Sequence, residues 1–253
     1  MYKHDNSMIA AIDLPAALGL LTRLPVTVDG THAMERGAAS AWAYPLVGVV
    51  LGVILAATTS VMLWIGMPSG IVAGLVLAGA VILTGAMHED GLADSADGLW
   101  GGWDKDRRLA IMKDSHIGVY GVCAIGLSLL IRWLALVVIV SLGAYWVAFI
   151  AAGAVSRAAM VVLMAMLPNA RDGGLSRSVG RPPTAAVWLA VVIAIGFALL
   201  CGYPWVILFA TMSALCCGAI ARAKIGGQTG DILGATQQVT EMVALITIVV
   251  SIT

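Results

Sequence analysis

The sequence predicts an all-α, polytopic integral membrane helical bundle with six to seven transmembrane helices, in a single domain that covers residues 1–253. Only 11% of the residues are charged, whereas soluble chains carry about 25%. The mean hydropathy is +0.98, and several apolar runs are long enough to cross a hydrocarbon core of about 30 Å as helix. The alternating pattern typical of membrane β-strands is absent from the sequence.

Hydropathy defines the expected spans in chain order. They cover residues 39–65, 69–87, 117–140, 142–167, 185–202, 204–221 and 237–253. Pro45 is expected to divide the first span into a short entry piece and a longer helix, because proline breaks a helix interior. An earlier segment, 13–21, is too short to span and is expected to be interfacial or packed against the bundle.

Charged residues indicate the orientation. Apart from Arg132, Arg157 and Glu241, every charged residue lies in segments 1–38, 88–116, 168–184 or 222–236. Two spans separate each of these polar segments from the next, so all four are expected on one side of the membrane. The positive-inside rule makes that side the cytoplasmic face of the cell inner membrane. A channel or carrier would need its polar groups along a path through the bilayer, not at one face.

The stretch "HEDGLADSADGLWGG" (88–102) concentrates acids. If 88–98 is a helix that extends the second span beyond the membrane, Asp90, Asp94 and Asp97 share one face at i, i+4 and i+7, and Glu89 points a quarter turn away. Like charges at this spacing destabilise a helix, and a divalent cation would remove that cost. Carboxylates without thiolates favour Mg²⁺ or Mn²⁺. The alternative is a solvated acidic helix end, and a zinc-protease motif is excluded by Leu92.

Three further polar stretches carry groups suited to a phosphate or diphosphate ligand. Asp104 is expected to cap a helix in "DKDRRLAIMKDS", with Arg107 and Asp114 on one face and Lys113 beside them; the alternative is an ordinary basic cytoplasmic loop. The other two stretches follow later in the chain. "NARDGGLSRSVGRPP" (169–183) offers Arg171, Arg177 and Arg181, and "KIGGQTGDILGA" (224–235) offers a glycine-rich turn followed by Asp231.

Three ionisable residues are expected inside the membrane, where they are costly unless paired or hydrated. Arg157 and Glu241 are expected to line an inward-facing cavity. Arg132 is expected nearer the outer side, where its side chain can extend to the interface.

"HEDGLADSADGLWGG" followed by "IMKDSHIGVYG" resembles the H-x-D-G-x-A-D-x-x-D-G and K-D-S-x-x-G-x-x-G signatures of the cobalamin synthase family, the adenosylcobinamide-GDP ribazoletransferases. "LLTRLPV", "YPLVGVVLG" and "GGQTGDILGAT" resemble that family's other landmarks in the same order. The resemblance implies a Mg²⁺-dependent membrane transferase with adenosylcobinamide-GDP and α-ribazole, or its 5′-phosphate, as substrates. GMP is released in a late step of cobalamin biosynthesis.

The resemblance also implies residue roles. The metal ligands would be Glu89, Asp90, Asp94 and Asp97, with Asp114 and Asp231 as further matches. Beside the resemblance, we hypothesise from the residues themselves that Asp114 or Glu89 accepts the hydroxyl proton. In the same hypothesis Arg107, Lys113 and either Arg177 or Arg181 hold the GMP phosphates.

Three other functions are weighed against this one. A non-catalytic membrane scaffold would give no reason for the acids on one helix face. A CDP-alcohol phosphotransferase would need arginine after Ala93, where Asp94 stands, and a divalent-cation transporter would need acids through the bilayer, where only Glu241 fits. Membrane lipid is an expected partner and nucleic acid is not, and a homo-oligomer stays open.

Overall fold

The computed structural model describes residues 8–253, and these form twelve α-helices and one 3₁₀-helix without a β-strand. In chain order they are α1 (Asp13–Leu21), α2 (Gly30–Arg36), η1 (Gly37–Ala43), α3 (Tyr44–Trp64), α4 (Ser69–Thr84), α5 (Met87–Gly101), α6 (Lys105–Ile111), α7 (Val119–Ser141), α8 (Tyr145–Met166), α9 (Leu175–Val179), α10 (Thr184–Leu200), α11 (Pro204–Ile225) and α12 (Gly230–Ile252). The predicted all-α class is confirmed.

Each of the seven expected spans corresponds to a long helix. Five helical segments are long and apolar enough to cross a membrane, and α4 with α5 forms a sixth if this bent pair is one span. α10 is apolar but shorter. The last helix begins at Gly230 rather than at residue 237, because Thr229 caps it by accepting from the amide of Ile232. Pro45 lies in the first turn of α3, directly after η1, where its missing N–H is tolerated.

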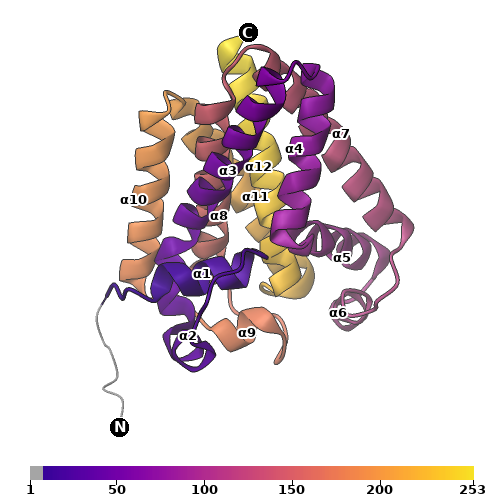
Figure 1. Ribbon diagram of the computed structural model, residues 1–253. Coiled ribbons are helices and arrows are strands. Elements are labelled where there is room, and N and C mark those ends of the chain that lie inside the picture. Colours follow the sequence, from indigo (N-terminus) through magenta and orange to yellow (C-terminus); the bar gives the residue numbers. More distant parts are fainter. Residues whose placement is uncertain (1–7) are drawn as a thin grey trace.

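The expected continuation of α4 into α5 is wrong. The two helices meet at 87°, so α5 runs across one end of the bundle (Figure 1). Gly85 and Ala86 both adopt left-handed backbone, with φ of 63° and 58°. Their amides donate to the carbonyls of Ile82 and Val81, which ends α4 with a helix-terminating turn.

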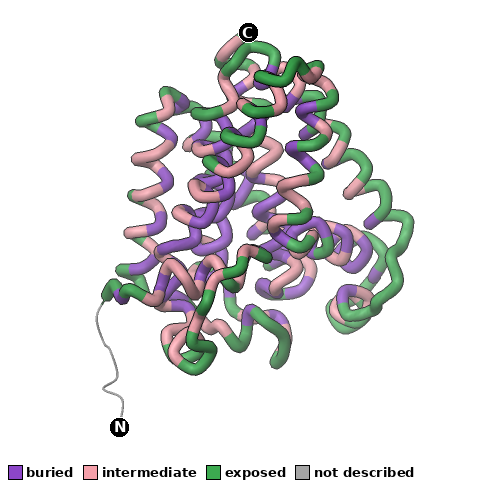
Figure 2. Tube along the Cα trace, viewed as in Figure 1, coloured by how far each residue is buried: buried purple, intermediate pink, exposed green. Residues whose placement is uncertain are grey.

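The core of the bundle lies around α8, the most enclosed of its helices (Figure 2). Small residues allow close packing there. α3 crosses α8 where Gly48 faces Gly153, and a side chain on Gly48 would overlap the Gly153 carbonyl. At Gly52 a Cβ atom would lie 2.8 Å from the carbonyl oxygen of Phe149. The two backbones therefore touch without intervening side chains.

The polar segments gather at one end of the molecule, as the charge pattern predicts. α1, α2, α5, α6 and α9 lie at the end opposite the C-terminus (Figure 1). Exposed tryptophans mark both ends: Trp103 precedes α6, whereas Trp64, Trp146 and Trp205 adjoin the short turns between spanning helices. Tryptophan is enriched at membrane–water interfaces, so these positions fit a bilayer between the two ends.

Candidate functional site

A cavity of about 190 Å³ opens at the polar end of the bundle. Residues of α1, α3, α5, α8, α9 and α12 line it together with the loop before α9. Its polar lining consists of Tyr44, His88, Asp90, Arg171, Ser176 and Asp231. Segments distant in the sequence therefore meet at one site.

Arg171 and Asp231 form an ion pair on one wall of this cavity. Nη2 of Arg171 donates to Oδ2 of Asp231 at 3.1 Å. Backbone bonds hold the two segments together, because Gln228 donates to the Pro168 carbonyl at 2.8 Å and Ala170 donates to the Gln228 carbonyl at 2.9 Å. The glycine-rich turn thus positions Asp231, at the start of α12, against the arginine loop.

The acids of α5 add negative charge near the ion pair of Arg171 and Asp231. Burial is the main cause that raises the pKa of Asp94 to about 7. The carboxylate of Asp90 adds to this increase, followed by those of Asp231 and Asp97, and Arg171 opposes it. Carboxylates from α5 and α12 are thus close enough to repel one another. Such an oxygen-rich, electronegative place suits a hard divalent cation.

Asp97 is held by the start of α7. Its Oδ2 accepts from the amide of Gly118 at 2.7 Å, and its Oδ1 accepts from the amide of Gly121 at 2.9 Å. These are N-terminal amides of α7, so the carboxylate caps that helix. A Cβ atom at Gly118 or Gly121 would overlap this carboxylate. The predicted metal ligand is therefore a structural cap in this conformation, a role that residue type and spacing did not indicate.

Glu89 points into the bundle, away from the other acids of α5. Its Oε1 accepts from Nη2 of Arg132 and from Nε2 of Gln238, both at 3.0 Å. The cause is the rotation of about 100° between successive helix positions. Within residues 8–253, no three His, Cys, Asp or Glu side chains are grouped so as to hold a metal. The predicted set of four metal ligands is thus not assembled.

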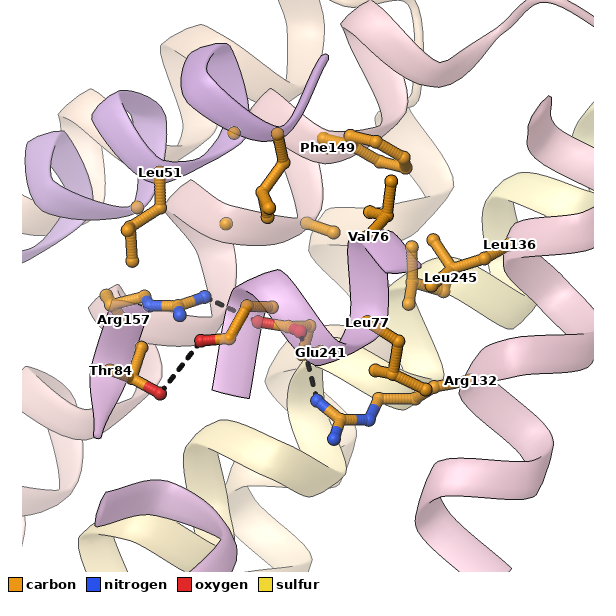
Figure 3. Close-up of a pocket in the computed structure, with 16 residues that line it drawn as sticks. Leu51, Val76, Leu77, Thr84, Arg132, Leu136, Phe149, Arg157, Glu241 and Leu245 are labelled. Carbon is orange, nitrogen blue, oxygen red and sulfur yellow. Dashed lines mark hydrogen bonds and ion pairs between the residues drawn. The ribbon is translucent and has the colours of Figure 1, made fainter. Parts of the chain in front are cut away.

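The three intramembrane charges form one connected cluster (Figure 3). Glu241 accepts from Arg157 at 2.5 Å and from Arg132 at 3.4 Å, and all three line a small cavity of about 50 Å³. The expectation that Arg157 and Glu241 line a cavity is confirmed. The expectation that Arg132 extends to the outer interface is wrong, because its side chain is only 2% exposed and its two carboxylate partners hold it inside.

Among known protein families, residues 13–249 match the family described as cobalamin-5-phosphate synthase. This chain belongs to that family. The resemblance drawn from the motifs is thereby confirmed, and neither the CDP-alcohol phosphotransferase nor the cation transporter is favoured.

Similar proteins support the same membership of the cobalamin-5-phosphate synthase family. An adenosylcobinamide-GDP ribazoletransferase of Bradyrhizobium diazoefficiens is 40% identical over 92% of this chain and 92% of its own length. Proteins of the same name from Mesorhizobium japonicum and Azorhizobium caulinodans are 40% and 39% identical, and they cover 92% and 94% of this chain and 91% and 95% of their own lengths. No solved structure matches this chain.

The remaining predicted residues of this family member are exposed at the polar end and do not line the 190 Å³ cavity. They are Arg107, Lys113, Asp114, Arg177 and Arg181. Asp114 lies 2.6 Å from Nδ1 of His116, which lowers the pKa of Asp114 and raises that of His116. Arg181 donates to the carbonyl of Ala165. Asp104 caps α6 as predicted, since it accepts from the amide of Arg107 at 2.9 Å.

The sequence reasoning missed three polar residues of the cavity, Tyr44, Ser176 and His88. His88 lies in the first turn of α5. It is 1% exposed, and neither ring nitrogen has a hydrogen-bond partner. Its place in the H-x-D-G signature was the available signal.

Proposed function

We propose that this chain is an adenosylcobinamide-GDP ribazoletransferase. It joins adenosylcobinamide-GDP to α-ribazole, or to α-ribazole 5′-phosphate, and releases GMP. One observation of the structure carries this proposal: Asp90 of α5 and Asp231 of α12 line one cavity with Arg171, and Asp94 lies near enough for their carboxylates to raise its pKa. A diphosphate ester needs such a place, because its charged oxygens require both a cation between carboxylates and a guanidinium.

The transfer replaces one P–O bond by another. A ribose hydroxyl of α-ribazole attacks the phosphorus that bears the cobinamide arm, and the bond from that phosphorus to GMP breaks. Positioning and charge neutralisation dominate such a step. Arg171 would contact the diphosphate from within the cavity, and Arg107, Lys113, Arg177 and Arg181 would contact it from the surrounding face.

The hydroxyl proton passes to a carboxylate. Asp114 is the more accessible of the two predicted acceptors, because it is exposed at the polar end, although its contact with His116 lowers its pKa and so its basicity. Glu89 is the weaker acceptor, since Arg132 and Gln238 hold it inside the bundle.

We propose Mg²⁺ as the cofactor. Asp90, Asp94 and Asp231 would hold it after moving closer together, because they are not grouped tightly enough for a metal in this conformation. The fit rests on the oxygen ligands and on the raised pKa of Asp94, which burial and then the neighbouring carboxylates cause. A bound Mg²⁺ would neutralise the diphosphate oxygens and stabilise the leaving GMP. Asp97 and Glu89 would act indirectly, because both orient α5 through α7. The polar end would face the cytoplasm at the inner membrane.

The test uses purified protein in nanodiscs with both substrates, with and without Mg²⁺, and detects GMP by mass spectrometry. Asp94→Asn should reduce transfer by more than about 100-fold, the scale for losing one group that stabilises transition-state charge. Its folding should persist, since the change removes a repulsive charge. Asp172→Asn is the matched control, because Asp172 is an exposed acid on the same face and lies outside the cavity lining.

Two results would contradict the proposal. The first is the absence of GMP with wild-type protein and both substrates. The second is near-wild-type turnover of Asp94→Asn at saturating Mg²⁺, which would remove the metal role from this carboxylate.

A further inference from the structure

A second and larger cavity lies on the opposite side of α5. It measures about 430 Å³, within the range of about 300–1,000 Å³ that ligand sites occupy. Its lining is almost wholly apolar and comes from α5, α7, α11 and α12; the residues are Leu92, Ser95, Ala96, Leu99, Trp100, Ala124, Ser213, Cys216, Cys217, Ile220, Ile232, Ala235 and Val239. We call this cavity the apolar groove.

The apolar groove lies between helices that face lipid. α7 packs mainly on α5, α4 and α12 and makes little contact with α11, and α5 crosses the polar end of the bundle between them (Figure 1). Exposed apolar side chains flank the groove on both helices, including Leu127 of α7 and Met212 of α11. The side chains that surround the groove are therefore apolar, as expected of a surface that faces lipid.

A positive charge lies at the polar end of the groove. Lys224 lies on the face of α11 that lines the groove. This follows from the helical spacing i, i+4, i+7 and i+11 of Ser213, Cys217, Ile220 and Lys224. Its Nζ donates to the Leu99 carbonyl at 2.8 Å and lies 4.8 Å from the ring centroid of Trp100, two residues that line the groove.

Lys224 has no carboxylate partner among residues 8–253. Its ammonium has three donors, and no carboxylate of residues 8–253 forms a salt bridge with it. A second ammonium lies at the end of α11, because a Cβ atom on Gly226, just after that helix, would lie 3.6 Å from Nζ of Lys105.

We propose that the apolar groove binds one acyl chain of an anionic phospholipid, with the lipid phosphate against Lys224 and Lys105. The positive charge at one end of the apolar groove favours an anionic phospholipid as its occupant. An apolar recess open to hydrocarbon accepts a chain, and two unpaired ammonium groups at its interfacial end complement an anionic headgroup. The buried hydroxyl of Ser95, 3% exposed and without a hydrogen-bond partner, also borders the groove. A lipid here contacts α5 on the side opposite Asp90 and Asp94.

Photolabelling tests the proposal without substrates or turnover, so its result does not depend on the proposed function. The protein is placed in phosphatidylcholine nanodiscs that contain phosphatidylglycerol with a diazirine in one acyl chain, and labelled peptides are mapped by mass spectrometry. We expect saturable labelling, at one lipid per chain, of the groove residues of α5, α7 and α11. Ala124→Trp and Cys216→Trp fill the groove and should remove most of this labelling. Val192→Trp, on an exposed face of α10, should not.

The headgroup is tested by a matched pair on the last turn of α11. Lys224→Gln should reduce the preference for phosphatidylglycerol over phosphatidylcholine about fivefold, the effect of one basic residue at a membrane surface. Arg222→Gln removes the same charge from the opposite helix face and should leave the preference unchanged. Labelling that the two groove-filling variants do not reduce, equal effects of Lys224→Gln and Arg222→Gln, or displacement of the label by α-ribazole would each overturn the proposal.

Discussion

Replacing Arg132 by methionine tests whether buried ion pairs hold α5 in place. The guanidinium lies 3.0 Å from Glu89 of α5 and 3.4 Å from Glu241 of α12. Two arginines, Arg132 and Arg157, balance these two glutamates. Methionine at position 132 therefore leaves one negative charge uncompensated among buried groups.

The magnitude follows from this imbalance. Removing one partner of a buried ion pair costs about 3–5 kcal/mol, whereas neutralising both partners costs far less. At about 2–4 °C per kcal/mol for a chain of this size, the unfolding temperature should fall by about 6–20 °C. The double variant Arg132→Met with Glu89→Gln removes one charge of each sign and should recover most of the loss.

The assay is thermal unfolding of detergent-purified protein, followed by circular dichroism. Arg222→Met is the control, because it removes an exposed arginine of α11 that forms no salt bridge within residues 8–253. The reasoning is refuted by a loss below about 1 kcal/mol in Arg132→Met, the scale of an exposed pair. A double variant no more stable than the single one would refute it as well.

Three further predictions follow from the site and the core. Because the folded-state pKa of Asp94 is raised to about 7, its contribution to stability is present below pH 4 and is lost as pH rises through 7. In EDTA, the gain in unfolding temperature from Asp94→Asn should therefore be larger at pH 8 than at pH 5, and equal gains would contradict this. Gly48→Ala should destabilise the fold by about 1–3 kcal/mol through its overlap with Gly153, whereas Gly196→Ala, with nothing within 4 Å, should not; equal unfolding temperatures would argue against the crossing. Arg177→Ala should raise the KM for adenosylcobinamide-GDP more than it lowers kcat, because an exposed arginine acts mainly on binding, and an unchanged KM would remove it from the site.

The membrane helices were predictable because hydropathy is a local property. The length of an apolar run is enough to identify it as a membrane span. The number of spans between the four polar segments was enough to place them on the same side of the membrane. The direction of α5 was not predictable in this way. It depends on left-handed backbone at Gly85 and at Ala86, and alanine gives no indication of such a conformation.

The acidic cluster was predicted from composition, but the contacts of two of its acids in this conformation were not. Helical spacing placed Asp90 and Asp94 together, and the structure agrees. Glu89 is held by Arg132 of α7 and Gln238 of α12, and Asp97 is held by the glycine amides that start α7. No periodicity within α5 identifies a partner on another helix, so these two acids could not be distinguished from ligands.

The four acids of α5 have two different roles, and this explains how such a charged helix keeps its position. Glu89 fixes α5 to the middle of α7 through Arg132, and Asp97 fixes it to the first turn of α7 through two amides. The two attachments lie two turns apart along α5, and together they define its rotation about its own axis. Asp90 and Asp94 then project from the remaining face without a basic partner on their own helix. Asp90 and Asp94 stay close to each other despite their repulsion, because the contacts of Glu89 and Asp97 with α7 hold α5 in this orientation.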